Sequence, residues 1–146
     1  MPVYARAEGC GLRVEFPTTL DVRFHHLPEG VRWELLSTFV VIVNGMEADQ
    51  RIIRVPGGFL TDFASVPRLP LVYLAYGNKA HLPALPHDYL YREGGTEEDR
   101  EYADKVFLHG MLATLVPDGD NSLTEEDAYQ MYNGVRLGGA NRFNFR

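Results

Sequence analysis

The stretch "PALPHDYLYREGGTEEDREYADKVF", residues 83–107, contains two helical patterns joined by a short connection with two glycines. The first helix is expected to begin at Leu85 or Pro86, because proline is tolerated in the first turn of a helix. It is expected to run through Tyr91 and to end before the glycines. Because the connection is short, we expect the two helices to pack antiparallel as a helical hairpin.

The second helix of this hairpin is expected over residues 97–114. At its start, Thr96 and Asp99 resemble a capping box with Asp in place of the usual Glu. A third helix is expected to begin near Ser122 or Thr124, and the glycine pair at 138–139 ends it. Apolar stripes place one face of each helix in the core: Ala103, Phe107 and Met111 on the second helix, and Ala128, Met131, Tyr132 and Val135 on the third.

The chain before the hairpin is β-rich and then rich in proline. Between residues 31 and 55, "VRWELLSTFVVIV" and "QRIIRV" flank an Asn-Gly turn signal, which predicts a β-hairpin or meander. Strands followed by helices indicate the α+β class. We therefore expect a single domain over residues 1–146, with an N-terminal antiparallel β part (1–56), a long shaped loop (57–85) and a C-terminal bundle of about three helices (86–146).

Composition excludes several classes of protein. The 146 residues suit one domain, and the net charge of −6 opposes the phosphate contacts that dominate nucleic-acid affinity. The single Cys10 cannot form an internal disulfide, which favours a reducing compartment or a virion assembled in one. The longest apolar run, residues 39–43, is far too short to cross a membrane, and the N-terminus lacks the layout of a signal peptide.

Three polar residues of the hairpin could carry chemistry. In an antiparallel pair, Asp104 can reach the imidazole of His87, and a carboxylate on one ring nitrogen leaves the other free to act as a general base. The alternative is structural, because a buried histidine is often only hydrogen-bonded and an acidic Asp88 in a first turn complements the helix dipole. A catalytic role requires His87 and Asp104 within hydrogen-bond reach, with the other ring nitrogen open to a cavity.

The preceding loop contains oxygen atoms that could bind a metal ion and a positively charged arginine side chain. In "GGFLTDFASVPR", residues 57–68, Asp62 either supplies a metal ligand, orients Arg68, or forms a local turn. Asp88 and Asp62 together could hold one divalent cation, and oxygen ligands favour calcium over zinc. We expect Ser65 and Arg68 of this loop, together with Tyr91 of the first helix, to contact a substrate.

The motifs "VPGGFLTDFASVPR", "HDYLYR" and "REYADKVF", in that order, resemble a family of short bacteriophage and prophage proteins catalogued as a domain of unknown function. The matched segments span about residues 55–111, and the weaker "MYNGVR" at 131–136 also fits. The resemblance implies a phage or prophage gene, often located among virion and tail-region genes. It implies no established activity.

A second, looser resemblance links "HDYLY" and "ADKVF" to the catalytic core of phospholipases A2. It implies that His87 is the general base, Asp88 the calcium ligand, Tyr91 a supporting hydroxyl and Asp104 the partner of His87. The glycine-rich calcium loop of those enzymes is absent in recognisable form.

Three functional hypotheses follow. The first is a virion-associated protein of the tail or baseplate region that carries a metal-assisted His-Asp hydrolase site. The second is a structural or adaptor protein of the particle without catalysis, for which an exposed apolar patch is expected. The third is an intracellular phage factor that acts on the host. For the first two we expect other virion proteins as partners, in a homo-oligomer or hetero-assembly, and a location in the virion after synthesis in the host cytoplasm.

Overall fold

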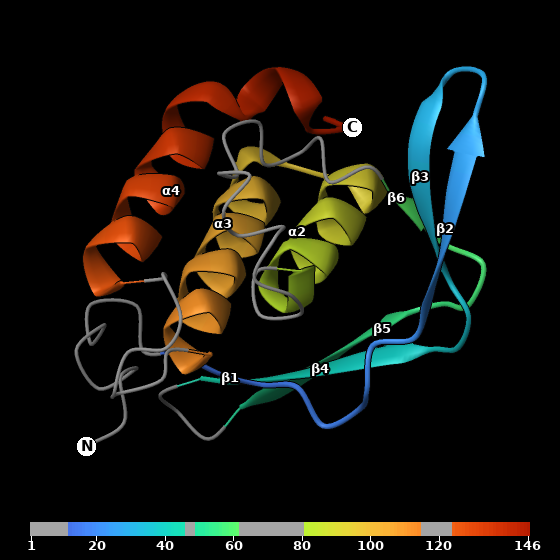
Figure 1. Ribbon diagram of the computed structural model, residues 1–146. Coiled ribbons are helices and arrows are strands. Elements are labelled where there is room, and N and C mark those ends of the chain that lie inside the picture. The colour runs from blue at the N-terminus through green and yellow to red at the C-terminus, as the bar shows by residue number, and fades with distance from the viewer. Residues whose placement is uncertain (1–11, 46–48, 62–80, 115–123) are drawn as a thin grey trace.

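The computed structural model describes residues 12–45, 49–61, 81–114 and 124–146. Antiparallel strands come first and three α-helices follow, which confirms the predicted α+β class (Figure 1). The strands form two three-stranded antiparallel sheets, one in the order β1-β4-β5 and one in the order β2-β3-β6. Their bounds are β1 Arg13–Glu15, β2 Val22–Leu27, β3 Gly30–Leu35, β4 Phe39–Asn44, β5 Gln50–Val55 and β6 Leu60–Thr61.

The hairpin predicted around the Asn-Gly signal is β4–β5. Phe39 lies opposite Val55 and Asn44 opposite Gln50, and the amide of Gly45 donates to the carbonyl of Asp49 at 2.8 Å. The run upstream of this turn is divided, however, because β3 and β4 belong to different sheets. The chain leaves β3 at the exposed residues 36–38, where other segments supply the hydrogen bonds: the Leu36 amide donates to the Asp21 carbonyl and the Val40 amide to Thr18 Oγ1.

The segment predicted as one loop over 57–85 contains regular structure at both ends. At its start, β6 pairs with β3, with Thr61 opposite Trp33. At its end, α2 spans His81–Glu93, so this helix begins four or five residues earlier than predicted. Pro86 lies inside the helix, where its missing N–H costs one backbone hydrogen bond, and the buried Ala84 and Leu85 beside it add packing that offsets this cost.

The other two helices agree closely with the sequence-based expectation. They are α3, Glu97–Ala113, and α4, Glu125–Gly138, followed by the short 3-10 helix η2, Ala140–Arg142. Both predicted starts carry complete capping boxes, with Thr96 and Asp99 on α3 and Thr124 and Asp127 on α4.

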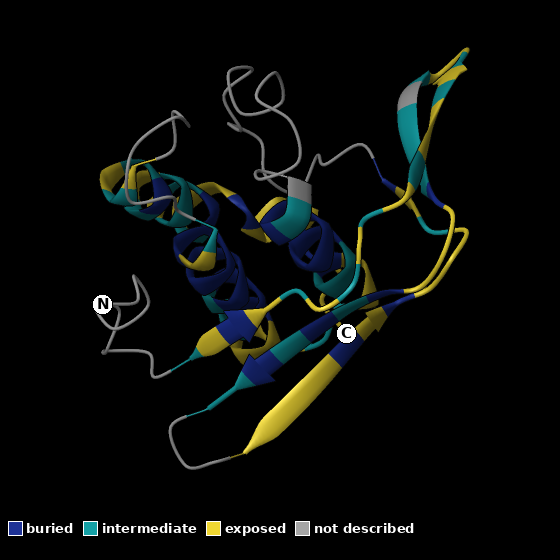
Figure 2. Cartoon of the chain, turned by 60° about the horizontal axis from the view of Figure 1, so that its bottom comes forward, coloured by how far each residue is buried: buried dark blue, intermediate teal, exposed yellow. Residues whose placement is uncertain are grey.

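The helices α2, α3 and α4 lie side by side, with α3 in the middle, and the β1-β4-β5 sheet crosses one end of them (Figure 1). The inward rows of that sheet pack against the helices in one core, which includes Val14, Phe39, Val41, Ile53, Phe107, Met111, Leu112 and Val135. Buried residues concentrate in α2, α3 and the inner row of β4, whereas β5 is largely exposed and the β2–β3 hairpin mixes exposed and intermediate residues (Figure 2). No helix in the described part of the chain has both the length and the apolar character needed to cross a membrane.

Candidate functional site

The predicted contact between α2 and α3 is present. His87 Nε2 lies 2.8 Å from Asp104 Oδ1, which is hydrogen-bond distance, and both side chains are 0% exposed. Asp104 accepts and the imidazole donates, because a carboxylate offers only acceptors when ionised. The expected distance is therefore confirmed. The second requirement for catalysis is a ring nitrogen that is open to a cavity. The structure gives no support for it, because the side chain of His87 has no exposed surface.

The Asp104 carboxylate is the centre of a buried network that joins all three helices. Its Oδ1 also accepts from the Tyr91 hydroxyl at 2.6 Å, one helical turn after His87 on α2. Its Oδ2 accepts from Arg136 Nη1 of α4 at 2.7 Å and lies 3.5 Å from Arg100 Nη1. Two guanidinium groups thus balance one carboxylate that is shielded from water.

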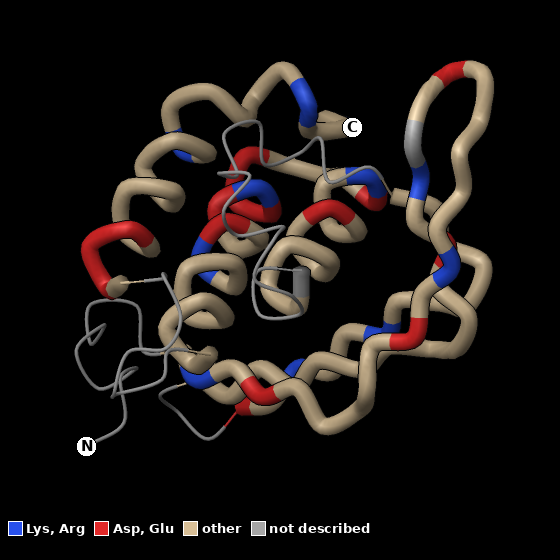
Figure 3. The backbone as a smooth tube through the Cα atoms, viewed as in Figure 1, with Lys and Arg blue, Asp and Glu red and all other residues tan. Residues whose placement is uncertain are grey.

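Glu97 extends this network toward the surface. It forms a two-pronged pair with Arg100, at 2.8 and 2.9 Å, and accepts from Arg136 Nη2 at 2.9 Å. Figure 3 shows acidic and basic residues side by side at the start of α3, where this cluster lies. The hydrogen bond from Arg100 keeps the pKa of Glu97 below its usual range. Arg100 also donates to the Val135 carbonyl at 3.1 Å, near the end of α4, where a positive charge is favourable.

Aromatic rings enclose the His87–Asp104 pair. The imidazole centroid lies 4.1 Å from the ring of Tyr91 and 5.0 Å from that of Phe107. Tyr91 in turn packs edge-on against Phe143, at 5.1 Å and 89°. Burial and the hydrogen bond to Asp104 raise the pKa of Tyr91, so its hydroxyl stays protonated and remains a donor at neutral pH.

Asp88 makes a second polar contact, between α2 and β6. Thr61 Oγ1 donates to Asp88 Oδ2, and Arg92, one turn further along α2, lies 3.5 Å from the same oxygen. The Arg92 guanidinium also donates to the Leu60 carbonyl and lies over the Phe59 ring at 4.9 Å. Because Asp88 is the eighth residue of α2, the alternative that it complements the helix dipole from the first turn is wrong. Its role in the described structure is to attach β6 to the helical hairpin.

Of the predicted site residues, the structure brings His87, Tyr91 and Asp104 together and places Asp88 on the same helix in a separate contact. Asp62, Ser65 and Arg68 lie outside the described residues, so their predicted roles stay predictions. Calcium binding by Asp88 also stays a prediction, because its expected co-ligand Asp62 is among them. Within the described ranges, no group of three or more His, Cys, Asp or Glu side chains is placed to hold a metal ion.

Sequence reasoning missed the two arginines that bind Asp104. A signal for both was present, because Arg100 precedes Asp104 by four residues in "REYADKVF" and Arg136 ends "MYNGVR". The four-residue spacing places Arg100 and Asp104 on one face of α3. The approach of Arg136 depends on how α4 packs, and no local pattern encodes that.

A family model described as "Protein of unknown function (DUF1353)" matches residues 33–124, and the chain belongs to this family. The match includes His87, Asp88 and Asp104, whereas Arg136 lies beyond it. Neither the curated proteins nor the solved structures contain a match to the chain. The looser resemblance to phospholipases A2 has no support from these comparisons.

Proposed function

We propose that the chain is a phage or prophage protein that serves as a structural or adaptor component of the virion, in the tail or baseplate region. The supporting observation is the β2–β3 hairpin, which projects beyond the helices and the β1-β4-β5 sheet (Figure 1). The phage assignment rests on the sequence motifs.

The hairpin presents one ring of an aromatic pair to solvent, while the other ring is partly buried against the core. Phe24 of β2 is 54% exposed and packs edge-on against Trp33 of β3, with ring centroids 5.0 Å apart. Paired aromatic residues of this kind are typical anchors of protein interfaces. Moreover, β2 is an edge of its sheet, so its outer backbone groups have no strand partner among the described residues and can pair with another chain. We infer that this hairpin contacts a neighbouring virion protein.

The buried Asp104 network suits a rigid adaptor better than an open catalytic site. The Asp104 carboxylate belongs to α3, and side chains of α2 and α4 donate hydrogen bonds to it. Displacing any of the three helices therefore leaves a buried charge or a buried donor unpaired. The Asp88 contact attaches β6, and through it the projecting hairpin, to the same helices. A hairpin fixed in this way holds its outer end in a defined position relative to the body.

The proposal is tested in phage particles purified from a host that carries the gene. We expect wild-type protein in the particles by mass spectrometry, and we expect Phe24→Asp to be incorporated poorly although circular dichroism shows that it is folded. Leu137→Asp is the matched control, because it also replaces an exposed apolar residue by Asp. Leu137 is 89% exposed and lies on α4, outside the hairpin, so this variant should be incorporated like wild type. Absence of the wild-type protein from particles refutes the virion assignment and favours the intracellular factor that acts on the host. Equal incorporation of Phe24→Asp refutes the role of the hairpin.

A second candidate, a hydrolase, is favoured by one observation: a histidine and a carboxylate held at 2.8 Å, with a tyrosine on the same oxygen. In this proposal Asp104 orients the imidazole of His87, and the helices open far enough for water to reach the buried ring, which then takes a proton from water during hydrolysis of an ester. The test is hydrolysis of a fluorogenic ester with and without added calcium, using wild type and His87→Gln. Activity that disappears in a folded His87→Gln variant supports catalysis, and an inactive wild type under both conditions refutes it.

A further inference from the structure

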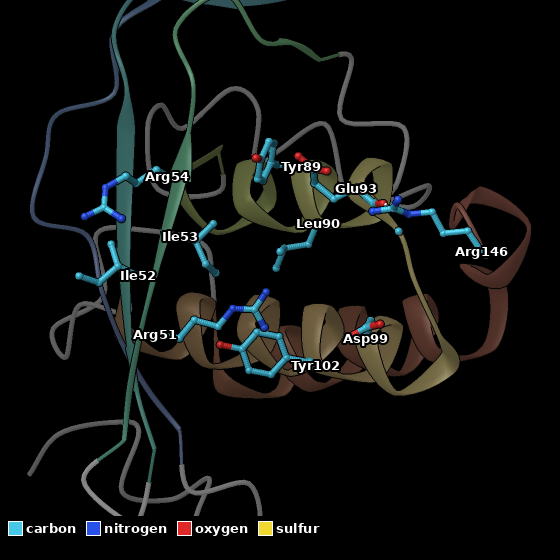
Figure 4. Close-up of a pocket in the computed structure, with 11 residues that line it drawn as sticks. Arg51, Ile52, Ile53, Arg54, Tyr89, Leu90, Glu93, Asp99, Tyr102 and Arg146 are labelled. Atoms are coloured by element: carbon cyan, nitrogen blue, oxygen red, sulfur yellow. The ribbon is translucent and has the colours of Figure 1, made fainter.

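We propose that the pocket between β5 and the helices α2 and α3 binds a small organic acid through Arg51 and Arg146, which recognise its carboxylate or phosphate group (Figure 4). This pocket has a volume of about 380 Å³, within the size range of small-molecule sites. It lies outside the Asp104 network, although α2 and α3 contribute to both. The inference is independent of the proposed virion role.

The two arginines reach the pocket from opposite sides. Figure 4 shows Arg51 extending from β5 toward the helices and Arg146 extending from the other side toward Glu93, whereas Ile52 and Arg54 point to the far side of β5. Arg51 points inward because it lies opposite Val43, whose side chain is buried in the core. Residues 51 and 146 are separated by most of the chain, so only the fold brings their charges together.

The guanidinium groups have unused donors. Arg51 lies over the ring of Tyr102 at 4.5 Å and forms no ion pair with any carboxylate in the described ranges. Arg146 donates through Nε to the Glu93 carbonyl at 2.8 Å, and its two terminal nitrogens have no hydrogen bond or ion pair with a described residue. A guanidinium carries five N–H donors in a planar fork, which matches the oxygens of a carboxylate or phosphate.

The acidic residues of the pocket are already engaged. Asp99 accepts from the Thr96 amide at 2.8 Å and from the Thr96 hydroxyl at 3.0 Å, as part of the capping box of α3. These bonds, helped by the positive charges of Arg51 and Arg146, hold the pKa of Asp99 below its usual range. Glu93 accepts from the Tyr89 hydroxyl, which raises the pKa of Tyr89. The pocket therefore offers more free donors than free acceptors, and an acceptor-rich ligand fits it.

The same acids limit the charge of the ligand. Glu93 and Asp99 repel an anion that carries several charges, so a molecule with one acidic group is favoured. Figure 4 shows Leu90 between the ends of the two arginines and Ile53 beside Arg51 on β5, and both provide an apolar surface for the carbon part of the ligand. The ligand class that follows is a small monocarboxylate with a few carbon atoms. A phosphate monoester of the same size carries nearly two negative charges at neutral pH and should bind more weakly.

Binding is tested by NMR titration of the full chain with three probes at constant ionic strength: lactate as the carboxylate, glycerol 3-phosphate as the phosphate ester, and glycerol as the neutral control. We expect saturable shifts of the Arg51 and Arg146 side-chain Nε–H signals with at least one anion and none with glycerol. Which anion binds more tightly identifies the acidic group. Shifts that fail to saturate with both anions, or that sodium chloride reproduces, overturn the proposal.

Single-residue variants test whether binding depends on the two arginines of this pocket or only on the general surface charge of the protein. Arg51→Gln and Arg146→Gln should each weaken binding by roughly tenfold or more, which is the usual effect of losing one charged hydrogen bond. Arg23→Gln, on the exposed part of β2, is the control and should leave the affinity unchanged. Equal weakening in all three variants, or none in the first two while each remains folded, refutes recognition by Arg51 and Arg146.

Discussion

His109 is a buried histidine whose two ring nitrogens have no hydrogen-bond partner among the described residues, and it gives a quantitative prediction about stability and pH. It lies on α3 and is 0% exposed. Burial, together with the positive charge of Lys105, lowers its pKa from 6.5 to about 4. Two consequences follow: the neutral ring is a costly core residue, and its protonation opposes folding.

The sign of the pH effect follows from proton binding. Between pH 6.5 and about 4 the unfolded chain protonates this histidine and the folded chain does not, so the unfolded state binds more protons. The contribution of His109 to the free energy of unfolding therefore falls as the pH falls. Each pH unit in this window costs about 1.4 kcal/mol, and the full shift costs about 3 kcal/mol at pH 4.

The perturbation is His109→Leu, which has similar volume and neither titrates nor leaves a polar atom unpaired. At pH 7.5 we expect the variant to be more stable than wild type by about 1–2 kcal/mol, because the desolvation cost of the ring nitrogens disappears. At pH 4.5 the difference should grow to about 3–5 kcal/mol, since the variant also escapes the protonation penalty.

Urea denaturation followed by circular dichroism at several pH values between 7.5 and 4.5 measures both effects. His26→Gln, at an exposed position of β2, is the control and should show the same pH dependence as wild type. Parallel stability curves for wild type and His109→Leu across this range would refute the reasoning, because they would mean that His109 is protonated equally well in the folded state.

The remaining predictions concern packing and caps, and each is measured by urea denaturation. Asp104→Ala should lower the free energy of unfolding by about 3–5 kcal/mol, because Arg100 and Arg136 lose the buried charge they pair with; a loss below about 1 kcal/mol would contradict the central role of this carboxylate. Gly139→Ala should cost about 1–3 kcal/mol, because its Cβ would lie 2.5 Å from the Val135 carbonyl oxygen and 2.6 Å from Tyr91 Oη, whereas Gly138→Ala meets nothing within 4 Å and should be neutral or stabilising. Thr96→Ala should cost about 1 kcal/mol through loss of the α3 cap, and Thr38→Ala, at an exposed position outside any helix, tests whether threonine removal alone has this effect.

The sequence predicted those features of the fold that short-range rules determine. Capping at Thr96 and Thr124, the stripe on α3 and the β4–β5 hairpin all follow from residues a few positions apart. The His87–Asp104 contact was also predictable, because a short connection forces two amphipathic helices to face each other.

The features that were missed depend on contacts between distant segments. The strand pair β3–β6 and the early start of α2 across two prolines are stabilised by packing that local propensity opposes or ignores. Arg136 reaches Asp104 from 32 residues away, and Arg51 and Arg146 line one pocket although they are far apart in the sequence. Positions of this kind are set by tertiary structure, so periodicity and spacing along the chain do not predict them.

The geometry around Asp104 also explains why a polar hydrogen-bond network is useful at the centre of this helical bundle. Apolar helix faces alone permit neighbouring helices to shift by a turn with little loss of contact, whereas hydrogen bonds have fixed partners. His87 and Tyr91, one turn apart on α2, both reach Oδ1, so α2 has only one position along α3 that satisfies both. Arg136 on Oδ2 fixes α4 in the same way. We infer that the network specifies how the three helices align. Replacing Asp104, Arg100, Arg136 and His87 by apolar residues, together with Tyr91→Phe so that no buried donor loses its acceptor, should retain much of the stability while broadening the NMR signals of α4 through exchange between alignments.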